Sequence, residues 1–302
     1  MRTSIVIPTH NRSQMVRRAI QSALDCGPRG SEVIVVNDGS KDDTEEVLDG
    51  YAPRVRAIHL PLPVGRSKAR NLGVESARGE FVILLDDDDW FLPGGPEALE
   101  QALSSAGPTA IVAYGRPEYV SLADDAVTIL ADRELPGMGS SGSVVSLLLK
   151  RNFIQCGTAI VRRKDYLNAG GCRSSSEPSE DWAIFLCLAL RGDVVYVDRP
   201  VTRILRHAGN TDPERFFFGK LDVLQSEIIL DLIRKSRAQG NQEVLNSLSS
   251  VLLRFAAGCQ HRSRFRTARR LVKLYCQCGK VPPLFTKEQL WRSWLPGRIN
   301  SP

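Results

Sequence analysis

The sequence lacks any apolar run long enough to cross a membrane. Two of its most apolar stretches, VVSLLL before Lys150 and AIFLCLAL before Arg191, fall far short of the roughly 20 residues that a membrane-spanning helix needs. The apolar part of the first segment, MRTSIVIPTHNR, is broken by Pro8 and is too short for a signal peptide. These absences predict a cytoplasmic protein without a transmembrane helix.

Loops and cysteine clusters typical of several other protein classes are absent as well. No G-x-G-x-x-G and no G-x-x-x-x-G-K-S/T follows a predicted strand, which argues against a dinucleotide oxidoreductase and a P-loop enzyme. The seven cysteines are odd in number and scattered, as expected of reduced core thiols. Cys276 and Cys278 are too few for a zinc site.

Acidic residues are missing between Val244 and Lys287, although the whole chain has 34 acidic and 40 basic residues. Seven basic residues crowd the same stretch: Arg254, Arg262, Arg264, Arg266, Arg269, Arg270 and Lys273. Nucleic acid, an anionic membrane surface or simple solubility would each explain this charge. We do not expect nucleic acid as a partner, because the stretch lacks a recognisable binding module and interleaved aromatic residues.

Strand-length apolar runs dominate the first third of the 302-residue chain. They occur at intervals that leave room for crossover helices: TSIVIP, EVIVVND, RAIHLP, EFVILLD and TAIVAYG. Between the first two, Met15, Val16, Ala19, Ile20 and Ala23 fall on one helical face. Continuous apolar strands that alternate with helices predict an α/β fold, with a mostly parallel sheet covered by helices on both faces.

The pattern changes along the rest of the chain. The segment around residues 137–143 is rich in Gly and Ser and has the composition of a mobile lid or a plain linker. From Arg215 onward two apolar stripes with helical spacing predict helices: Phe217, Leu221, Leu224, Ile228 and Leu232, then Leu245, Leu248, Leu252 and Phe255. We therefore divide the chain into residues 1–210 and a basic helical region, residues 211–302.

Four consecutive aspartates follow the most hydrophobic strand, in FVILLDDDDWFLP. Adjacent carboxylates repel each other, and this run lies between an apolar strand and aromatic residues instead of in polar surroundings. A hard divalent cation or a cationic ligand would supply the missing positive charge. The alternative is an acidic turn that caps the next helix, and the run alone does not decide between the two.

Polar residues follow three of the predicted strands, at residues 8–12, 37–40 and 86–89. Ligands of open α/β sheets bind beyond the carboxyl ends of the strands, so these segments predict one shared crevice. There Asp38 would accept hydrogen bonds from a ribose or a pyrimidine N–H, and Arg66 and Arg70 would meet phosphate. The aspartates would hold Mg²⁺ or Mn²⁺ on a diphosphate.

Four segments, in this order, resemble glycosyltransferase family 2, the nucleotide-sugar transferases of the GT-A fold: SIVIPTHNR, EVIVVNDGSKDDT, GRSKARNLGVESARGEFVILLDDDDWFLP and SEDWAIFLCLALRG. The resemblance implies a Rossmann-like GT-A catalytic domain over residues 1–210. It also implies that a sugar is moved from a nucleotide-diphosphate donor, such as a UDP-sugar, to a hydroxyl acceptor with inversion at the anomeric carbon. The setting would be polysaccharide or glycolipid biosynthesis.

The resemblance assigns donor-binding roles to residues after the first two strands. It implies that Thr9, Asn11 and Asp38 bind the donor, with Thr9 and Asp38 at the nucleotide base. Arg66, or Arg70 as the alternative, is implied to lie near the donor phosphates.

Within the aspartate run, the resemblance makes Asp86-x-Asp88 the family's D-x-D motif. Asp86 then meets the ribose or the sugar, and Asp88 binds Mn²⁺ or Mg²⁺. The register of the motif stays open because Asp87 and Asp89 are also acidic, so Asp87 remains a candidate for donor binding. His207 matches a place where the family can supply a further metal ligand, although a lone His is most often a surface or core residue.

Glu180 and Asp181 stand just before an apolar helix in SEDWAIFLCLAL. Taken alone, they are first-turn acids that stabilise the helix dipole. The resemblance implies instead that Asp181 is the catalytic base, which removes a proton from the acceptor hydroxyl. Trp182 either stacks on the acceptor or belongs to the core.

Other functions remain open at this stage. A nucleotidyltransferase or pyrophosphorylase would also need an α/β sheet and a carboxylate-bound metal, but PTHNRSQM is not its usual Gly-rich, basic phosphate loop. A glycoside hydrolase would need two carboxylates and no diphosphate site. A nucleotide-sugar-binding protein without catalysis is the alternative outside the enzymes.

The basic C-terminal region has two interpretations once the resemblance is considered. Many members of the family use lipid-linked acceptors, which implies a peripheral contact with the inner membrane surface. Charge would then act together with partial insertion of four apolar residues: Leu271, Val272, Leu274 and Tyr275. The alternative is a solvated helical cap that packs on the catalytic domain.

Overall fold

The computed structural model describes residues 2–123, 126–129, 141–150, 152–174, 179–207, 224, 227–261 and 265–279 of the chain. Residues 137–140 of the Gly- and Ser-rich segment lie outside these ranges, and its last three residues begin a helix. Phe217 and Leu221 of the first predicted apolar stripe also lie outside the described residues. Within the described residues, no helix is both long and apolar enough to cross a membrane.

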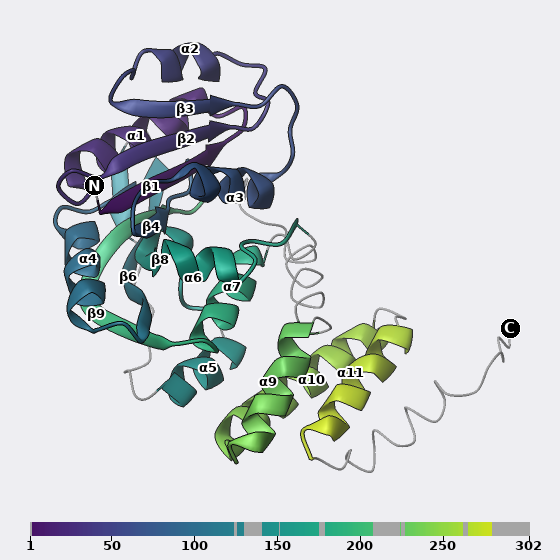
Figure 1. Cartoon of the computed structure of the whole chain (residues 1–302). Helices are drawn as coiled ribbons and strands as arrows, with labels where there is room; N and C mark the ends of the chain where they lie inside the picture. The colour runs from purple at the N-terminus through teal and green to yellow at the C-terminus, as the bar shows by residue number, and fades with distance from the viewer. Residues whose placement is uncertain are drawn as a thin grey trace, which may run out of the picture.

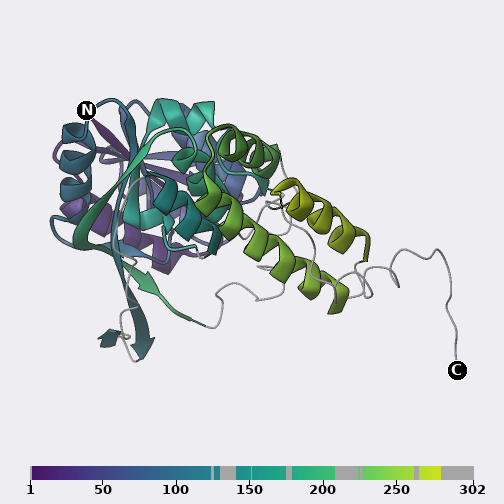
Figure 2. The ribbon, with the colours of Figure 1, turned by 90° about the horizontal axis from the view of Figure 1, so that it is seen from below.

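The strands of the described residues form one sheet, in the order β3-β2-β1-β4-β8-β6-β9-β5, with β7 beside β6. Their bounds are β1 Thr3–Thr9, β2 Glu32–Asn37, β3 Val55–His59, β4 Phe81–Leu84, β5 Trp90–Phe91, β6 Ala110–Ala123, β7 Ala126–Ile129, β8 Ala159–Arg162 and β9 Asp193–Leu205. Figure 2 shows the long β6 reaching beyond the rest of the sheet, where it pairs with β7.

The sheet is parallel in one half and mixed in the other. Strands β1 to β4 pair in parallel, as the crossover pattern predicted. Strand β8 then lies between β4 and β6 and is antiparallel to both, while β9 is parallel to β6. The α/β fold class is confirmed. The mixed half arises because strands that are distant in the sequence become neighbours in the sheet.

Helices cover both faces of the sheet (Figure 1). Their bounds are α1 Ser13–Cys26, α2 Thr44–Asp49, α3 Arg66–Ser76, α4 Gly95–Ser105, α5 Ser141–Lys150, the 3-10 turn η1 Cys156–Thr158, α6 Arg163–Asn168, α7 Glu180–Ala189, α9 Glu227–Ala238, α10 Gln242–His261 and α11 Phe265–Gln277. Side chains alternate between the faces of a strand. In β1, Ile5 and Ile7 therefore pack with α1, α2 and α4, whereas Val6 packs with α3 and α7.

Helices α9, α10 and α11 lie together beside the α/β layer (Figure 1). The second predicted stripe of Leu245, Leu248, Leu252 and Phe255 is buried, which confirms its helical spacing. These side chains belong to the same apolar cluster as residues of α5 and α7, so the helices share a core with the second half of the chain's α/β part. The division at residue 210 stays a prediction.

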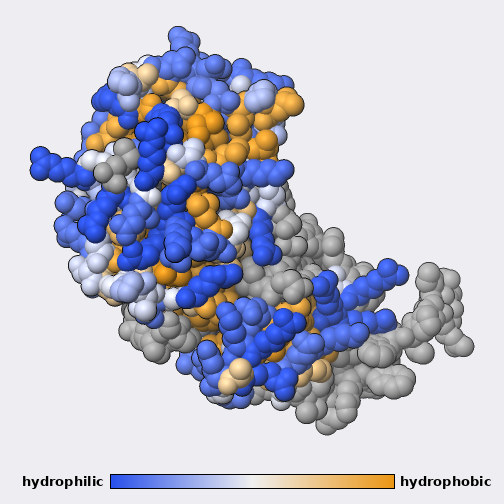
Figure 3. All heavy atoms as spheres, viewed as in Figure 1, coloured by the Kyte–Doolittle hydropathy of each residue, from blue (hydrophilic) through white to orange (hydrophobic). Residues whose placement is uncertain are grey.

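Helix α11 turns its apolar residues toward the protein. Leu271, Leu274 and Tyr275 are buried, whereas Arg270 and Lys273 are exposed. Hydrophilic side chains accordingly cover most of the visible surface of this helical group (Figure 3). Three of the four apolar residues predicted to insert into a membrane are therefore buried in the core and unavailable for insertion, and the fourth, Val272, is half-buried. Only the basic outer face of α11 remains available to contact an anionic surface.

Candidate active site

The loops after β1, β2 and β4 meet at one edge of the sheet, because these strands are parallel neighbours. Thr9 ends β1, and its Oγ1 donates a hydrogen bond of 2.8 Å to Oδ2 of Asp87 in the loop after β4. The backbone N–H of Asp38, after β2, donates to the carbonyl of Thr9 at 2.9 Å. The predicted shared crevice thus has its three segments side by side.

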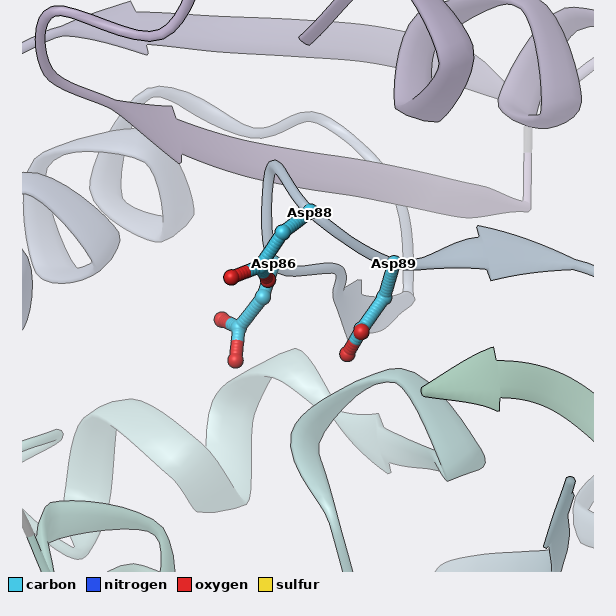
Figure 4. Close-up of side chains that lie close together, drawn as sticks. All are labelled: Asp86, Asp88 and Asp89. Carbon is cyan, nitrogen blue, oxygen red and sulfur yellow. The ribbon is translucent and has the colours of Figure 1, made fainter. Parts of the chain in front are cut away.

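The aspartate run forms a tight turn, closed by a 3.1 Å hydrogen bond from the N–H of Asp89 to the carbonyl of Asp86. Asp86, Asp88 and Asp89 each present a carboxylate oxygen, and these oxygens lie within 4.8 Å of one another. Figure 4 shows the three carboxyl groups pointing to the same side of the loop. The side chain of Asp87 does not belong to this group, because the turn directs it back toward Thr9.

Basic side chains surround this loop. Arg12 Nη1 lies 2.9 Å from Oδ1 of Asp87 and 2.9 Å from Oδ2 of Asp88. Arg70 pairs with Asp86, and His207 Nε2 lies 3.1 Å from Oδ2 of Asp88. The guanidinium groups of Arg12 and Arg70, from two other segments, therefore reduce the repulsion within the run.

The carboxyl groups of the loop have different proton affinities. Burial raises the pKa of Asp87 to about 6, although Arg12 acts in the opposite direction. Burial also raises the pKa of Asp89 well above its usual range, and the charges of Asp86 and Asp88 add to this. Burial would raise the pKa of Asp86 too, but Arg70, together with Arg66 and Arg12, outweighs it, so the pKa of Asp86 is lowered.

The residues of the loop suit a hard divalent cation. Three carboxylate oxygens close together are the ligands that Mg²⁺ and Mn²⁺ prefer, and the imidazole of His207 beside Asp88 suits Mn²⁺ better than Mg²⁺. Burial, together with the charges of Asp86 and Asp88, disfavours the ionised form of Asp89 and raises its pKa. A cation bound here would favour the ionised form.

Asp38 and Asn11 hold loops of the crevice in place. Asp38 accepts hydrogen bonds from the N–H groups of Val64 and Gly65, at 2.6 and 2.9 Å. Asn11 adopts a positive φ of 53°, and its Oδ1 accepts a 2.7 Å hydrogen bond from the N–H of Lys41. The side-chain oxygens of both predicted donor-binding residues therefore already accept hydrogen bonds from backbone N–H groups.

The glycine after Asp38 is required by a close approach of two loops. Gly39 has a positive φ of 66°, and a Cβ built on it would lie 2.6 Å from the backbone nitrogen of Pro63. A larger residue would push away the segment that donates to Asp38. The loop between β3 and α3 thus closes directly over the end of β2.

Arg66 and Arg70 stand on successive turns of α3 and differ in exposure. The side chain of Arg66, at the first residue of the helix, is 41% exposed, whereas that of Arg70 is 3% exposed. Arg70 donates to Oε1 of Glu180 at 2.6 Å, and Arg66 Nε lies 3.2 Å from the same oxygen. Arg66 is the better placed of the two to meet a phosphate group from solvent.

Asp181 lies in the first turn of α7, where its carboxylate has two partners. Its Oδ2 accepts a 2.9 Å hydrogen bond from Nδ2 of Asn152, and its Oδ1 accepts one of 2.6 Å from the backbone N–H of Trp182. Burial raises the pKa of Asp181 to about 6, and the neighbouring charge of Glu180 acts in the same direction. A carboxylate with this pKa is ionised at neutral pH and is more basic than an exposed aspartate.

Trp182 belongs to the core. Its side chain is buried, and its indole N–H donates a 2.6 Å hydrogen bond to the carbonyl of Leu148 in α5. The alternative that it stacks on an acceptor is therefore wrong. The sequence could not separate the two, since both use the same aromatic surface.

Sequence patterns assign no site role to three residues that contact the site. Arg12 lies in a strand-end segment, Glu180 is a first-turn acid, and Asn152 belongs to no motif. For Arg12 a signal existed, because it belongs to the same strand-end segment as Thr9 and Asn11. For Asn152 none existed, since its contact with Asp181 spans 29 residues.

The metal-free protein should become more stable as the pH falls from about 7.5 to about 5.5. Asp87 and Asp181 have a pKa of about 6 in the folded protein, above the ordinary value of 3.8. As the pH falls through the folded-state pKa of about 6, these two groups take up protons in the folded protein but not yet in the unfolded chain. The free energy of unfolding therefore increases on acidification over this range. Urea unfolding in the presence of a chelator would measure this, and a free energy that falls over this range would contradict it.

The sequence profile of glycosyl transferase family 2 matches residues 4–168, more than half of the chain. The chain belongs to this family. The resemblance inferred from the four segments is thereby confirmed, and the matched range contains Thr9, Asp38, Arg70 and the aspartate loop. Asp181 and His207 lie beyond it.

Curated relatives in this family match part of the chain. A putative glycosyltransferase of Bacillus subtilis, EpsH, is 35% identical over 107 residues, which cover 34% of this chain and 30% of that protein. The glycosyltransferase GlyG of Streptococcus pneumoniae is 32% identical over 89 residues, which cover 28% of this chain and 30% of that protein. The matches thus span about a third of these two relatives' length.

Solved structures with the same fold match nearly the whole chain. The crystal structure of residues 1–349 of S. aureus TarS in complex with UDP-GlcNAc has a TM-score of 0.61 and 15% sequence identity, and the match covers 99% of this chain and 94% of that one. The structure of the same fragment in complex with UDP has a TM-score of 0.58 and 16% identity. At this identity the likeness establishes the GT-A fold of this family 2 member.

Proposed function

We propose that this protein transfers a sugar from a nucleotide-diphosphate donor, a UDP-sugar, to a hydroxyl acceptor with inversion at the anomeric carbon. One observation carries the proposal: Arg70 joins Asp86 of the loop after β4 to Glu180, the residue that directly precedes Asp181. Family membership supports it. UDP and UDP-GlcNAc in the TarS crystals support a uridine diphosphate donor.

The metal would be held by Asp88 together with Asp86, Asp89 and His207. When bound, such an ion neutralises charge on the diphosphate and so makes it a better leaving group. Among the surrounding residues, Arg66 offers its partly exposed guanidinium to a phosphate oxygen. Thr9 and Asp38 would define the base pocket, Asp38 by fixing the backbone of Val64 and Gly65.

Asp181 would act as the general base. The acceptor oxygen forms a bond to the anomeric carbon while the bond from that carbon to the diphosphate oxygen breaks, and the hydroxyl proton moves to the Asp181 carboxylate. Asn152 and the N–H of Trp182 hold this carboxylate in one orientation. A single displacement of this kind inverts the anomeric configuration and needs no covalent intermediate.

The acceptor would be a glycan or a glycolipid hydroxyl, as in polysaccharide or glycolipid biosynthesis. Exposed basic residues on α10 and α11 would allow contact with an anionic membrane surface by charge alone: Arg254, Arg266, Arg270 and Lys273. Their apolar neighbours are buried, so the contact would be peripheral and sensitive to salt.

A panel of nucleotide sugars would test the proposed function. We expect a UDP-sugar to raise the melting temperature in the presence of Mn²⁺ and to be slowly hydrolysed, because binding to the folded state alone stabilises it. Sugar nucleotides with other bases serve as the comparison. Stabilisation without any turnover, even with added acceptors, would favour a binding protein, and conversion of the UDP-sugar and added pyrophosphate into UTP and a sugar 1-phosphate would favour a pyrophosphorylase.

A further inference from the structure

A buried ion pair connects the aspartate loop with the helix that carries Asp181. Arg70 of α3 donates from Nη1 to Oε1 of Glu180 at 2.6 Å, and the side chains of both residues are only 3% exposed. The other terminal nitrogen of Arg70 donates to Oδ1 of Asp86. One guanidinium therefore holds an acid of the loop after β4 and an acid of α7 at the same time.

The pair is not arranged for maximal stability. Nε of Arg70 and Oε2 of Glu180 are both buried and have no hydrogen-bond partner in the part of the chain that the structure describes. A buried ion pair stabilises a protein only when its remaining donors and acceptors are satisfied, and apolar residues of similar volume often serve stability better. A role in the geometry of the site explains such a pair better than a contribution to folding does.

We propose that Arg70 and Glu180 are positioning residues, which set the place and orientation of the Asp181 carboxylate relative to the loop that carries Asp86. The proposal rests on the proposed function, in which Asp181 is the base. Glu180 begins α7, and Asp181 follows it in the same helical turn. Fixing Glu180 to Arg70 therefore fixes where the helix begins, and with it the backbone of Asp181.

Charge adds to this effect. Asp181 is faced by Glu180 beside it, by Arg70 from α3, by Cys156 from η1 and by the buried Cys172. Burial is the first cause of its raised pKa, and the negative charge of Glu180 is the second. Neutralising Glu180 while Arg70 keeps its charge should thus make Asp181 a weaker base.

Glu180→Gln tests the proposal, since glutamine keeps the size of the side chain but removes the charge that pairs with Arg70. We expect kcat to fall about ten- to hundredfold, as misplacement of a catalytic group typically causes, while the KM for the donor stays within about threefold. The acid limb of the pH profile of kcat should also move to lower pH. Loss of stability alone would not move that limb.

Arg70→Lys provides a second variant that keeps the positive charge. Lysine has no planar fork to hold Asp86 and Glu180 together, so kcat should fall here too. Glu45→Gln in the first turn of α2 and Arg17→Lys on α1 are matched controls, because both residues are exposed and lie outside the site. Both controls should behave like the unaltered protein.

Normal kcat and an unmoved acid limb in Glu180→Gln would overturn the positioning role. If circular dichroism shows that Glu180→Gln does not fold, Arg70→Lys decides by the same criterion. Asp181→Asn separates this proposal from the proposed function. Retained turnover in Asp181→Asn would show that Asp181 is not the base. An inactive Asp181→Asn combined with a normal Glu180→Gln would contradict only the positioning role of Arg70 and Glu180.

Discussion

Asp181→Asn is expected to lower kcat by roughly two to four orders of magnitude, as loss of a general base typically does. Asparagine keeps the size of the side chain, and its carbonyl oxygen can still accept a hydrogen bond from Asn152 or Trp182. It cannot accept the acceptor's proton. Steady-state kinetics with the best donor would measure the loss, and calorimetry should find the affinity for UDP nearly unchanged.

The matched control for Asp181→Asn is Glu97→Gln, which removes an exposed first-turn acid from helix α4. If both variants lose activity equally, the helix dipole and not the base explains the effect. Product stereochemistry gives an independent check. An α-linked donor should yield a β-linked product by NMR, and retention of the α configuration would show that the single-displacement mechanism is wrong.

Asp88→Asn is expected to weaken metal-dependent binding of UDP by on the order of a few kcal/mol, because a charged ligand of the metal is lost. Asp88 belongs to the group of carboxylates that lie within 4.8 Å of one another and also contacts His207. Asp87→Asn should have a smaller effect, because Asp87 is directed to Thr9 and Arg12. Titration of UDP in the presence of Mn²⁺ would measure both.

Asp49→Asn is a suitable control for both aspartate variants, since its side chain is 73% exposed in α2. If Asp88→Asn leaves the affinity for UDP unchanged, Asp88 is not a ligand of the metal. A larger loss in Asp87→Asn than in Asp88→Asn would reverse the assigned register of the motif. Repeating the titrations with a chelator separates direct contacts from contacts through the metal.

The sequence predicted the elements of the first half well, because their signals are local. β1, β2 and β4 are continuous apolar runs, and α1 has a single apolar face, so each pattern needs only its own residues. The pairing of β8 between β4 and β6 was not predictable in this way. Which strands become neighbours depends on packing between segments that are far apart in the chain.

The site was predicted as a set of residues but not as an arrangement. Parallel strands that end at one edge bring Thr9, Asp38 and the aspartate loop together, which the strand pattern alone implied. The turn that separates Asp87 from its neighbours is set by one backbone hydrogen bond between Asp86 and Asp89. In the sequence the four acids are consecutive, so their order alone leaves the register of the motif open.

The sequence by itself determined that this chain is an α/β protein, that it belongs to a sugar-transferring family, and which strand ends carry its polar residues. Only the tertiary structure decided that Trp182 and Leu271 are core residues, and that Arg12 and Glu180 complete the site. The physical reason is the separation along the chain between the residues that determine each feature. Hydrophobic periodicity records which face of an element is buried, whereas the partner of a buried charge is fixed by contacts such as that of Arg70 with Glu180, which spans 110 residues.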